Sequence, residues 1–305
     1  MKFGNLNYQK IKSDYLKYLH SQEVMSEPFR DKLSQLKKFY LPISNMINEE
    51  YIKDKKVKII GITGGQGSGK STISNILKII LKKMFNLNTV IFSIDDFYKT
   101  LKARKKMSLK TSPLFLIRGV PGTHDTKLLL NTIKKLKKSK FDKVNIPKFD
   151  KSIDNRLPKK YWQSIKKKPD IIIFEGWCVG AKPQNNKDLL MPINKLEKEK
   201  DKKSIWRLYV NNKLNKDYSK IFKLIDKLIF LKVPSFKKVY EWRLLQEKKL
   251  RTRSKGSKIM NDNEIKNFIM FYERITRHML ITMTKKSDVI VKIDNKHKLK
   301  SIEFN

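Results

Sequence analysis

The feature that most constrains this chain is a glycine-rich stretch that lies between an apolar run and a helical pattern. Residues 64–71 fit the spacing G-x-x-x-x-G-K-[ST]. The run before it, residues 57–63, is short, apolar and rich in β-branched side chains, which predicts a buried strand. From Ile73 onward the apolar residues recur at helical spacing. A chance match seldom falls between a strand and a helix, so we predict a loop that binds the phosphates of a nucleoside triphosphate.

Each part of this loop has a physical use in phosphate binding. Glycine permits positive φ and leaves room for backbone N–H groups to point at a phosphate at the start of a helix. Lys70 is expected to act in catalysis by reaching the β- and γ-phosphates of ATP, and the Ser71 hydroxyl is expected to bind Mg²⁺. The predicted nucleotide-binding residues are Gly64, Gly65, Gln66, Gly67, Ser68, Gly69, Lys70, Ser71 and Thr72.

Two further apolar runs predict buried strands that end in acidic residues. Residues 89–94 lead into Asp95, and residues 170–174 lead into Glu175. Ligands of α/β proteins bind at the carboxyl ends of parallel strands. We interpret Asp95 as the base for an attacking hydroxyl and as a metal ligand, and Glu175 as the second carboxylate that organises Mg²⁺. The alternatives are that Asp95 or Asp96 only caps a following turn and that Glu175 is only a turn residue.

The remaining pattern predicts a phosphate-loop fold with three layers, α/β/α, around a mostly parallel sheet. Residues 1–55 are interpreted as two or three helices, broken at Pro28 and Pro42, that pack on the core. Residues 56–305 are interpreted as the main domain. Strands are also predicted at residues 228–233 and 287–293, and helices at residues 126–138, 204–218 and 264–283 and from residue 235.

Several connecting segments carry candidates for binding a second substrate. Residues 99–112 are rich in lysine and poor in apolar side chains, which predicts a surface loop. We expect acceptor-side loops at about residues 99–125 and 147–160, although His124 and Asp125 could instead cap a helix and the charged residues could form a solvated loop. The predicted substrate-binding residues are Asp96, Tyr98, Arg118, His124, Asp125, Lys148, Asp150 and Lys151.

Two later segments are interpreted as covers for the site. Residues 182–202 are charged and interrupted by proline, which predicts a loop or flap. Residues 247–260 are interpreted as a helical lid in which Arg251 and Arg253 bring positive charge to the transferred phosphoryl group. The alternative is a solvated helix end.

The net charge of +41 raises the question of nucleic-acid binding. Sixty of the seventy basic residues are lysine, and they are spread over every segment. Nucleic-acid sites usually add arginine and exposed aromatic side chains. We therefore expect a small-molecule acceptor as partner, with no specific nucleic acid and no membrane, while the sequence leaves the oligomeric state open.

The single cysteine, Cys178, excludes an internal disulfide and is compatible with a reducing compartment. No secretory signal and no apolar run long enough for a membrane span are visible, so a cytoplasmic location is expected. The Asn-Lys-x-Asp guanine reader is absent, which disfavours a GTPase. A phosphate cradle, magnesium-binding acids, a base and a basic lid together indicate a small-molecule kinase.

Five motifs in order resemble those of the plant-type D-glycerate 3-kinases, which are related to phosphoribulokinase, uridine kinase and bacterial pantothenate kinase. The resemblance covers roughly residues 30–295, and Phe149 stands where that family more often has tyrosine. The motifs are the glycine-rich residues 64–71, SIDDFY at 93–98, RGVPGTHD at 118–125, PKFDKS at 147–152 and FEGW at 174–177.

The resemblance implies transfer of the γ-phosphoryl group of ATP to a hydroxyl of D-glycerate, with ATP and Mg²⁺ as cofactors. Arg118 is our first choice for holding the carboxylate of the acceptor, because a guanidinium can bind a carboxylate through two hydrogen bonds. One alternative is a kinase for uridine, a pentulose phosphate or pantothenate. An alternative of another class is a nucleotide-dependent regulatory protein that associates with nucleic acid.

Overall fold

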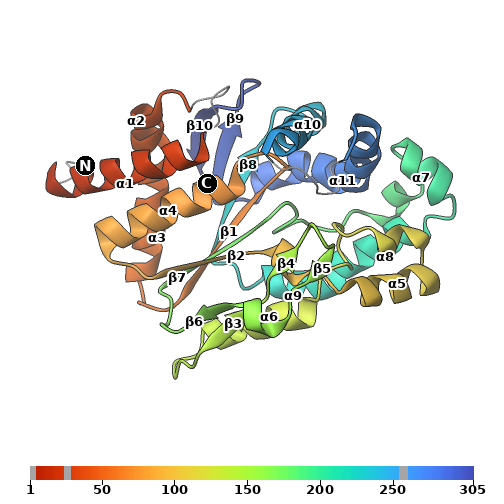
Figure 1. Cartoon of the computed structure of the whole chain (residues 1–305), viewed down its shortest axis with the longest axis horizontal. Helices are drawn as coiled ribbons and strands as arrows, with labels where there is room; N and C mark the ends of the chain where they lie inside the picture. The colour runs from red at the N-terminus through yellow and green to blue at the C-terminus, as the bar shows by residue number, and fades with distance from the viewer. Residues whose placement is uncertain (1–4, 24–28, 254–259) are drawn as a thin grey trace.

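A six-stranded sheet forms the centre of the molecule, in the order β10-β9-β8-β1-β7-β2 (Figure 1). The computed structural model describes residues 5–23, 29–253 and 260–305. Strands β1, β2, β7, β8 and β9 run parallel to one another, and β10 runs antiparallel to β9. The predicted α/β fold with a mostly parallel sheet is confirmed, while β10 was not predicted. The strands are β1 (Lys58–Gly64), β2 (Thr89–Ser93), β7 (Ile171–Gly176), β8 (Lys227–Lys232), β9 (Val289–Ile293) and β10 (Leu299–Phe304).

Helices cover both faces of this sheet, as a three-layer fold requires (Figure 1). Helices α1, α3 and α4 lie on one side, and α6 and α9 lie on the other (Figure 1). The bounds are α1 (Asn5–Gln22), α3 (Leu41–Ile52), α4 (Lys70–Phe85), α6 (Thr126–Leu136), α8 (Ile205–Lys213), α9 (Ser219–Phe222), α10 (Phe236–Arg253) and α11 (Asp262–Thr282).

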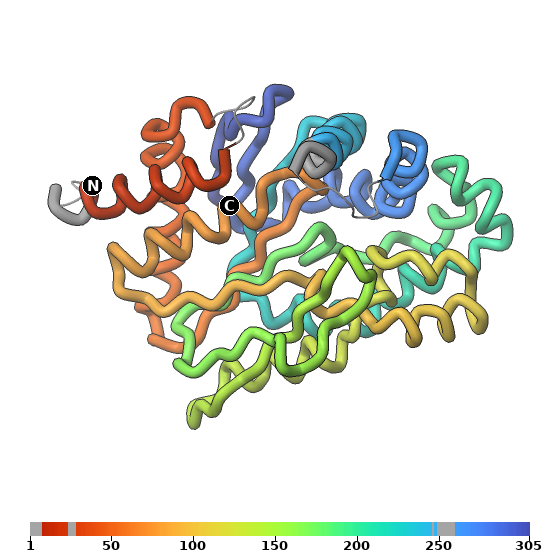
Figure 2. The backbone as a smooth tube through the Cα atoms, viewed as in Figure 1, coloured from red at the N-terminus to blue at the C-terminus, as the bar shows by residue number. Residues whose placement is uncertain are grey.

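The N-terminal helices belong to the same hydrophobic core as the sheet. Ile11, Tyr15 and Leu19 follow one another at i, i+4 spacing on α1 and are all buried. Helix α1 runs beside α4, the helix that follows the glycine-rich loop (Figure 2). Packing of the N-terminal segment therefore supports the layer that carries this loop.

The prediction that Pro42 breaks the N-terminal helices was wrong. A continuous helix runs from α2 (Lys32–Gln35) through a π-helical segment (Leu36–Tyr40) into α3. Pro42 lies in the first turn of α3, directly after the π-helical segment. Because the wider π turn shifts the backbone register, the ring and the missing N–H are accommodated without ending the helix. Pro28 lies outside the described residues.

The lysine-rich segment predicted as a surface loop contains a helix, α5 (Leu101–Lys110). The Thr100 side chain caps its first turn by accepting a hydrogen bond from the N–H of Ala103. Arg104 is fully buried and donates to the carbonyl of Leu116 at 2.5 Å and that of Asp154 at 2.7 Å. The prediction was wrong because an arginine, instead of apolar side chains, anchors this helix.

The segment predicted as a flap at residues 182–202 also contains helical structure, with a short 3₁₀ turn (Asn186–Leu189) and α7 (Lys195–Lys200). Two buried arginines hold it. Arg207 donates to the carbonyl of Leu189 at 2.5 Å and pairs with Asp201 at 3.0 Å. Arg274, on α11, pairs with Glu197 at 2.6 Å and donates to backbone carbonyls of the same segment.

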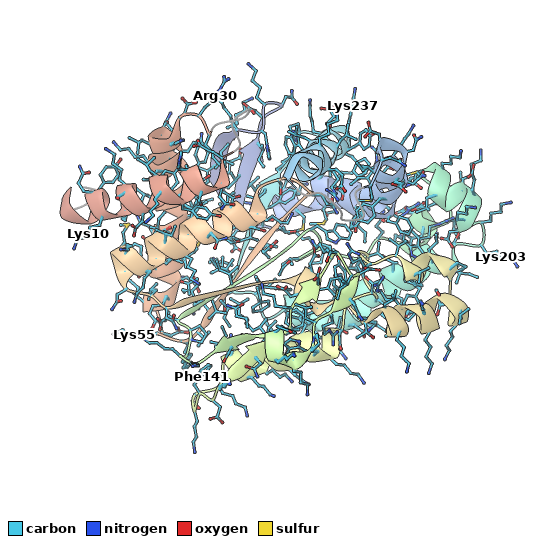
Figure 3. The ribbon with its side chains drawn as sticks, in the orientation of Figure 1. Lys10, Arg30, Lys55, Phe141, Lys203 and Lys237 are labelled. Carbon is cyan, nitrogen blue, oxygen red and sulfur yellow. The ribbon has the colours of Figure 1, made fainter. Side chains whose placement is uncertain are left out.

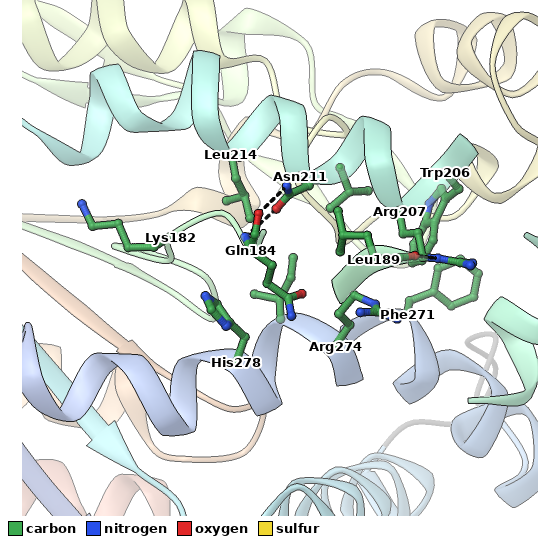
Figure 4. A pocket seen from close by; sticks show the side chains of 12 residues that line it. Lys182, Gln184, Leu189, Trp206, Arg207, Asn211, Leu214, Phe271, Arg274 and His278 are labelled. Atoms are coloured by element: carbon green, nitrogen blue, oxygen red, sulfur yellow. Dashed lines mark hydrogen bonds between the residues drawn. The ribbon is translucent and has the colours of Figure 1, made fainter. Parts of the chain in front are cut away.

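A small cavity of about 20 Å³ lies between α8, α11 and this segment (Figure 4). A volume of this size holds about one water molecule, so this cavity offers no room for a substrate.

Arg251 and Arg253 lie in the last turn of α10. Their side chains and residues 254–259 lie outside the described residues, and the proposed lid role of these arginines stays a prediction. In the described part of the chain, no helix combines the length and the apolar character needed to span a membrane.

Candidate active site

The glycine-rich loop joins the end of β1 to the start of α4. Gly67 and Gly69 have φ of 78° and 85°, in the left-handed region that favours glycine. A Cβ at Gly65 would lie 2.6 Å from the Val239 side chain, so that glycine is also required by space. Lys70, the first residue of α4, donates from Nζ to the carbonyls of Gly64 at 3.0 Å and Gly65 at 2.9 Å. The backbone of the loop thus binds the ammonium group of Lys70.

Two side chains of this loop have buried polar atoms without a hydrogen-bond partner among the described residues. They are the amide of Gln66 and the hydroxyl of Ser68. Buried polar groups normally have partners in native proteins. Unpartnered donors in a glycine loop at a helix N-terminus fit the phosphates of a nucleotide.

Ser71 and Glu175 meet beside the loop, because β7 is the direct neighbour of β1 in the sheet. The Ser71 hydroxyl donates to Oε1 of Glu175 at 3.0 Å. Burial raises the pKa of Glu175, and the nearby charge of Lys70 opposes this rise. Hydroxyl and carboxylate oxygens are the donors that Mg²⁺ prefers, so this pair fits the metal of a bound Mg²⁺–nucleotide.

Asp95 follows β2 in a short 3₁₀ turn (Ile94–Phe97) and accepts two hydrogen bonds. Its Oδ1 accepts from the Tyr98 hydroxyl at 2.9 Å, and its Oδ2 accepts from Nζ of Lys151 at 2.8 Å. Burial alone would raise the pKa of Asp95, but the charge and hydrogen bond of Lys151 outweigh burial and lower it to about 2. The carboxylate is therefore ionised at neutral pH.

Glu175 contacts the phosphate loop through Ser71, and Asp95 lies close enough for its charge to act on Lys70. In the register of the sheet, Ser93 at the end of β2 pairs with Glu175. Burial lowers the pKa of Lys70, and the negative charges of Glu175 and Asp95 act on its ammonium group in the opposite direction. The structure therefore brings Lys70, Glu175 and Asp95 together at one edge of the sheet.

Asp96 has a local structural role in this turn. Its Oδ2 accepts from the backbone N–H of Ser93 at 3.1 Å, while the Ser93 hydroxyl accepts from the N–H of Asp95 at 3.2 Å. These reciprocal bonds form a capping box. The geometry thus favours the capping alternative for Asp96 over substrate binding.

Tyr98 and His124 form one buried pair beside Asp95. Their backbones make an antiparallel bridge, and their rings stack with centroids 4.4 Å apart. Nδ1 of His124 lies 2.6 Å from the Tyr218 hydroxyl, and Nε2 has no partner among the described residues. Burial lowers the pKa of His124 to about 3, although Asp95 acts in the opposite direction. The imidazole is neutral at pH 7, and its Nε2 is able to form a hydrogen bond with a bound substrate.

Asp125 and Arg118 each have an ionic partner in the protein. Asp125 caps α6 by accepting from the N–H of Leu128 at 3.1 Å, and it pairs with Arg156 at 3.2 Å. Nη1 of Arg118 pairs with Asp154, and the guanidinium lies 5.5 Å from the centroid of the Phe149 ring. A guanidinium has five N–H donors, so Arg118 can bind Asp154 and a substrate carboxylate at once.

The PKFDKS segment forms a small hairpin from β4 (Phe149–Asp150) and β5 (Asn155–Arg156). Lys151, at its turn, is the residue of this hairpin that contacts Asp95. Asp150 accepts from the backbone N–H of Ser152 at 2.8 Å and thereby shapes the turn. Lys148 is exposed, and its charge acts on Asp96.

Two tyrosines of this site were not predicted from the sequence, and Arg156, in the predicted acceptor-side loop, had no individual role assigned. Arg156 donates from Nη2 to the carbonyl of Tyr98 at 2.8 Å and so stabilises the backbone of the Tyr98–His124 bridge. Tyr218 holds His124, and the hydroxyl of Tyr272 donates to the carbonyl of Arg118 at 3.3 Å. Both tyrosines lie in helical segments whose spacing carries no sign of this role.

Figure 3 shows how the positive charge is distributed. The labelled residues Lys10, Lys55, Lys203 and Lys237 lie at the periphery, on different elements (Figure 3). The surface lysines are thus spread around the molecule, whereas the cations of the site, Lys70 and Lys151, contact specific oxygen atoms.

Comparison with known proteins identifies relatives of this chain. Residues 59–191 match the family described as phosphoribulokinase / uridine kinase. An uncharacterized kinase, mug58, of Schizosaccharomyces pombe is 36% identical over 222 residues, which cover 70% of this chain and 78% of that protein. The chloroplastic D-glycerate 3-kinase of Arabidopsis thaliana is 29% identical over 222 residues, covering 70% of this chain and 46% of that protein.

A solved structure shares the fold. The D-glycerate 3-kinase from Cryptococcus neoformans var. grubii superposes with a TM-score of 0.74 at 23% identity, covering 87% of this chain and 99% of that chain. Together with the phosphate loop, these similarities show that the chain is a P-loop kinase, a phosphotransferase, that belongs to the phosphoribulokinase / uridine kinase family.

Proposed function

We propose that this protein transfers the γ-phosphoryl group of ATP to D-glycerate and forms 3-phosphoglycerate in the presence of Mg²⁺. The observation that carries the proposal is the position of Asp95, whose carboxylate is ionised, lies close enough for its charge to act on Lys70, and contacts Lys151 at 2.8 Å. Similarity to two D-glycerate 3-kinases supports the choice of acceptor.

The phosphate loop would hold the nucleotide. The backbone of residues 64–69 and the unpartnered groups of Gln66 and Ser68 would bind the β- and γ-phosphates. Lys70 would exchange its two carbonyl partners for phosphate oxygens. Ser71 and Glu175 would hold Mg²⁺, which supplies positive charge to the phosphate oxygens when bound.

Asp95 would orient the acceptor hydroxyl and accept its proton. A carboxylate with a pKa of about 2 is a weak base, so its main contribution is to hold the hydroxyl in line with the γ-phosphorus. A loose phosphoryl-transfer transition state requires positioning and charge more than strong proton abstraction. Lys151, already bound to Asp95, would place a positive charge beside the transferred group.

The surroundings of Asp95 suit a small anionic alcohol. Arg118 and Lys151 provide positive charge for a carboxylate, and Nε2 of His124 provides a neutral polar contact for a hydroxyl. Tyr98 and His124 are buried beside Asp95, whereas Asp95 and Lys151 stay partly exposed and accessible to a substrate. A three-carbon hydroxy acid matches these groups better than a nucleoside does.

An acceptor panel tests the proposal directly. ADP release is measured with ATP and Mg²⁺ in the presence of D-glycerate, L-glycerate, uridine, ribulose 5-phosphate or pantothenate. We expect D-glycerate to give the largest stimulation over the rate without acceptor. Stronger stimulation by one of the other compounds would replace the proposed acceptor, and no stimulation by any acceptor would contradict the assignment.

A further inference from the structure

A second concave site lies behind the catalytic residues. It is a groove of about 560 Å³, within the range of volumes that hold small ligands. One wall is helix α5, and Tyr209 of α8 stands in another. Four cationic residues line it together with one carboxylate: Lys99, Lys106, Lys110, Arg156 and Asp125.

Helix α5 presents one particular face to the groove. Ala103, Lys106, Met107 and Lys110 line it, and their spacing of three and four residues places them on one side of a helix. Lys102 and Lys105 are also exposed but do not line the groove. The same helix therefore offers two lysines inside the groove and two outside it.

The inner end of the groove is formed by Lys99 and Asp125, which directly follow Tyr98 and His124 in the chain. Side chains alternate between the two faces of an extended backbone. In the Tyr98–His124 bridge, the rings stack beside Asp95, whereas the next residues, Lys99 and Asp125, face the groove.

Lys99 and Arg156 reach back to that bridge. Nζ of Lys99 donates to the carbonyl of His124 at 3.0 Å, and Arg156 donates to the carbonyl of Tyr98 at 2.8 Å. Burial lowers the pKa of Lys99, and Asp125 counters this effect while Arg156 adds to it. These two cations are partly buried and fixed in place, unlike the lysines spread over the rest of the surface.

We propose that this groove is a second binding site, for a small organic phosphate of the size of a sugar phosphate. Lys99 and Arg156 would hold one anionic group at the inner end, and Lys106 and Lys110 would hold another at the rim. Lysine binds phosphate as a compact positive charge, and arginine adds directed N–H donors. Asp125 does not oppose an anion strongly, since it is paired with Arg156 and caps α6.

Calorimetric titration with fructose 1,6-bisphosphate tests this site, with fructose as the uncharged control. The full-length protein is loaded with ADP and Mg²⁺, so that the phosphate loop is occupied, and the buffer contains physiological salt to suppress non-specific attraction. We expect saturable binding of the bisphosphate at about one molecule per chain and no binding of fructose. Absence of saturable binding would overturn the proposal.

The two pairs of lysines on α5 provide matched variants. Lys106→Gln/Lys110→Gln should weaken bisphosphate binding about tenfold, while Lys102→Gln/Lys105→Gln should change it by less than about twofold. Both double variants remove the same charge from exposed positions of one helix, so thermal unfolding should be equal in the two. Equal weakening in both would show a general effect of net charge and would contradict a site in the groove.

A competition arm distinguishes the groove from the acceptor site. If saturating D-glycerate leaves the affinity for the bisphosphate unchanged, the two sites are separate, as proposed. If D-glycerate displaces the bisphosphate, the binding belongs to the acceptor site and the proposal of a second site is wrong. These binding readouts do not depend on turnover, so they stand or fall separately from the proposed kinase reaction.

Discussion

The phosphate loop and the acceptor wall are built in opposite ways. We call Tyr98, Arg118, His124 and Lys151 the acceptor wall. The phosphate loop is one continuous stretch, residues 64–72, and most of its binding groups belong to the backbone. The acceptor wall comes from three separate segments, and Arg118, His124 and Lys151 are each held by a partner far away in the sequence. A continuous backbone site is determined locally, whereas the wall exists only when the tertiary structure is complete.

This difference predicts that nucleotide binding and phosphoryl transfer can be separated. Asp95→Asn should lower kcat for the D-glycerate reaction by roughly 10² to 10⁴, because the acceptor hydroxyl loses its partner. The Kd for ADP should stay within about threefold of the wild-type value, since the phosphate loop is intact. Steady-state kinetics and calorimetry measure the two quantities.

The neighbouring residue supplies the control. Asp96→Asn keeps an oxygen that can accept from the N–H of Ser93, so the turn and the turnover should be nearly unchanged. Equal loss of kcat in both variants would mean that the turn, and not the Asp95 carboxylate, is what catalysis requires.

The second prediction removes the buried support of the acceptor wall. Arg104→Met should lower the free energy of unfolding by about 3–5 kcal/mol, because Asp154 and two backbone carbonyls lose a buried cationic partner. Lys105→Met, at an exposed position of the same helix, should change it by less than about 0.5 kcal/mol. Urea unfolding followed by circular dichroism gives both values, and similar stabilities would show that Arg104 is not an anchor.

The third prediction concerns the pH dependence of stability. The pKa of His124 is about 3 in the folded protein, below its value of about 6.5 in an unfolded chain. Between these values the unfolded state binds more protons, so stability falls as the pH drops below about 6.5. The titration of His124 should therefore lower the free energy of unfolding by about 3 kcal/mol between pH 7 and pH 4.

A His124→Gln variant isolates this contribution. Glutamine has no titrating group, so its free energy of unfolding should fall less steeply than that of the wild type over the same pH range. Parallel curves for the two proteins would show that His124 does not titrate with a depressed pKa.

The fourth prediction concerns the acid limb of the pH–rate profile. Because the pKa of Asp95 is about 2, its protonation should not limit kcat/KM above about pH 4 in the wild type. Lys151→Met removes the main opposition to burial, so the pKa of Asp95 should rise by about 1–3 units and the acid limb should move to higher pH. Superimposable limbs would contradict the role of Lys151.

The parts of the molecule that could be predicted from sequence are those that short segments determine. The apolar runs predicted β1, β2, β7, β8 and β9, and the glycine spacing predicted the loop between β1 and α4. Strand β10 was missed because its residues, 299–304, alternate weakly and carry charges near the C-terminus. It is placed by its pairing with β9.

The missed parts depend on polar anchors that sequence patterns do not reveal. Helix α5 is held by the buried Arg104, and the segment at residues 182–202 is held by Arg207 and Arg274. The sequence alone does not show whether an arginine is buried or solvated, so these charge-rich segments were predicted as loops. In the acceptor wall, the same limitation hid the Asp154 partner of Arg118 and the Tyr218 partner of His124.

Phosphorus NMR of a reaction containing ATP, Mg²⁺ and D-glycerate most directly tests whether the phosphate loop and the acceptor wall act on one phosphoryl group. We predict a new phosphomonoester resonance that grows in equal amount with ADP, and no such resonance with the Asp95→Asn protein. Formation of ADP and inorganic phosphate without a phosphomonoester would contradict the account, because it would mean that the wall does not deliver glycerate to the nucleotide.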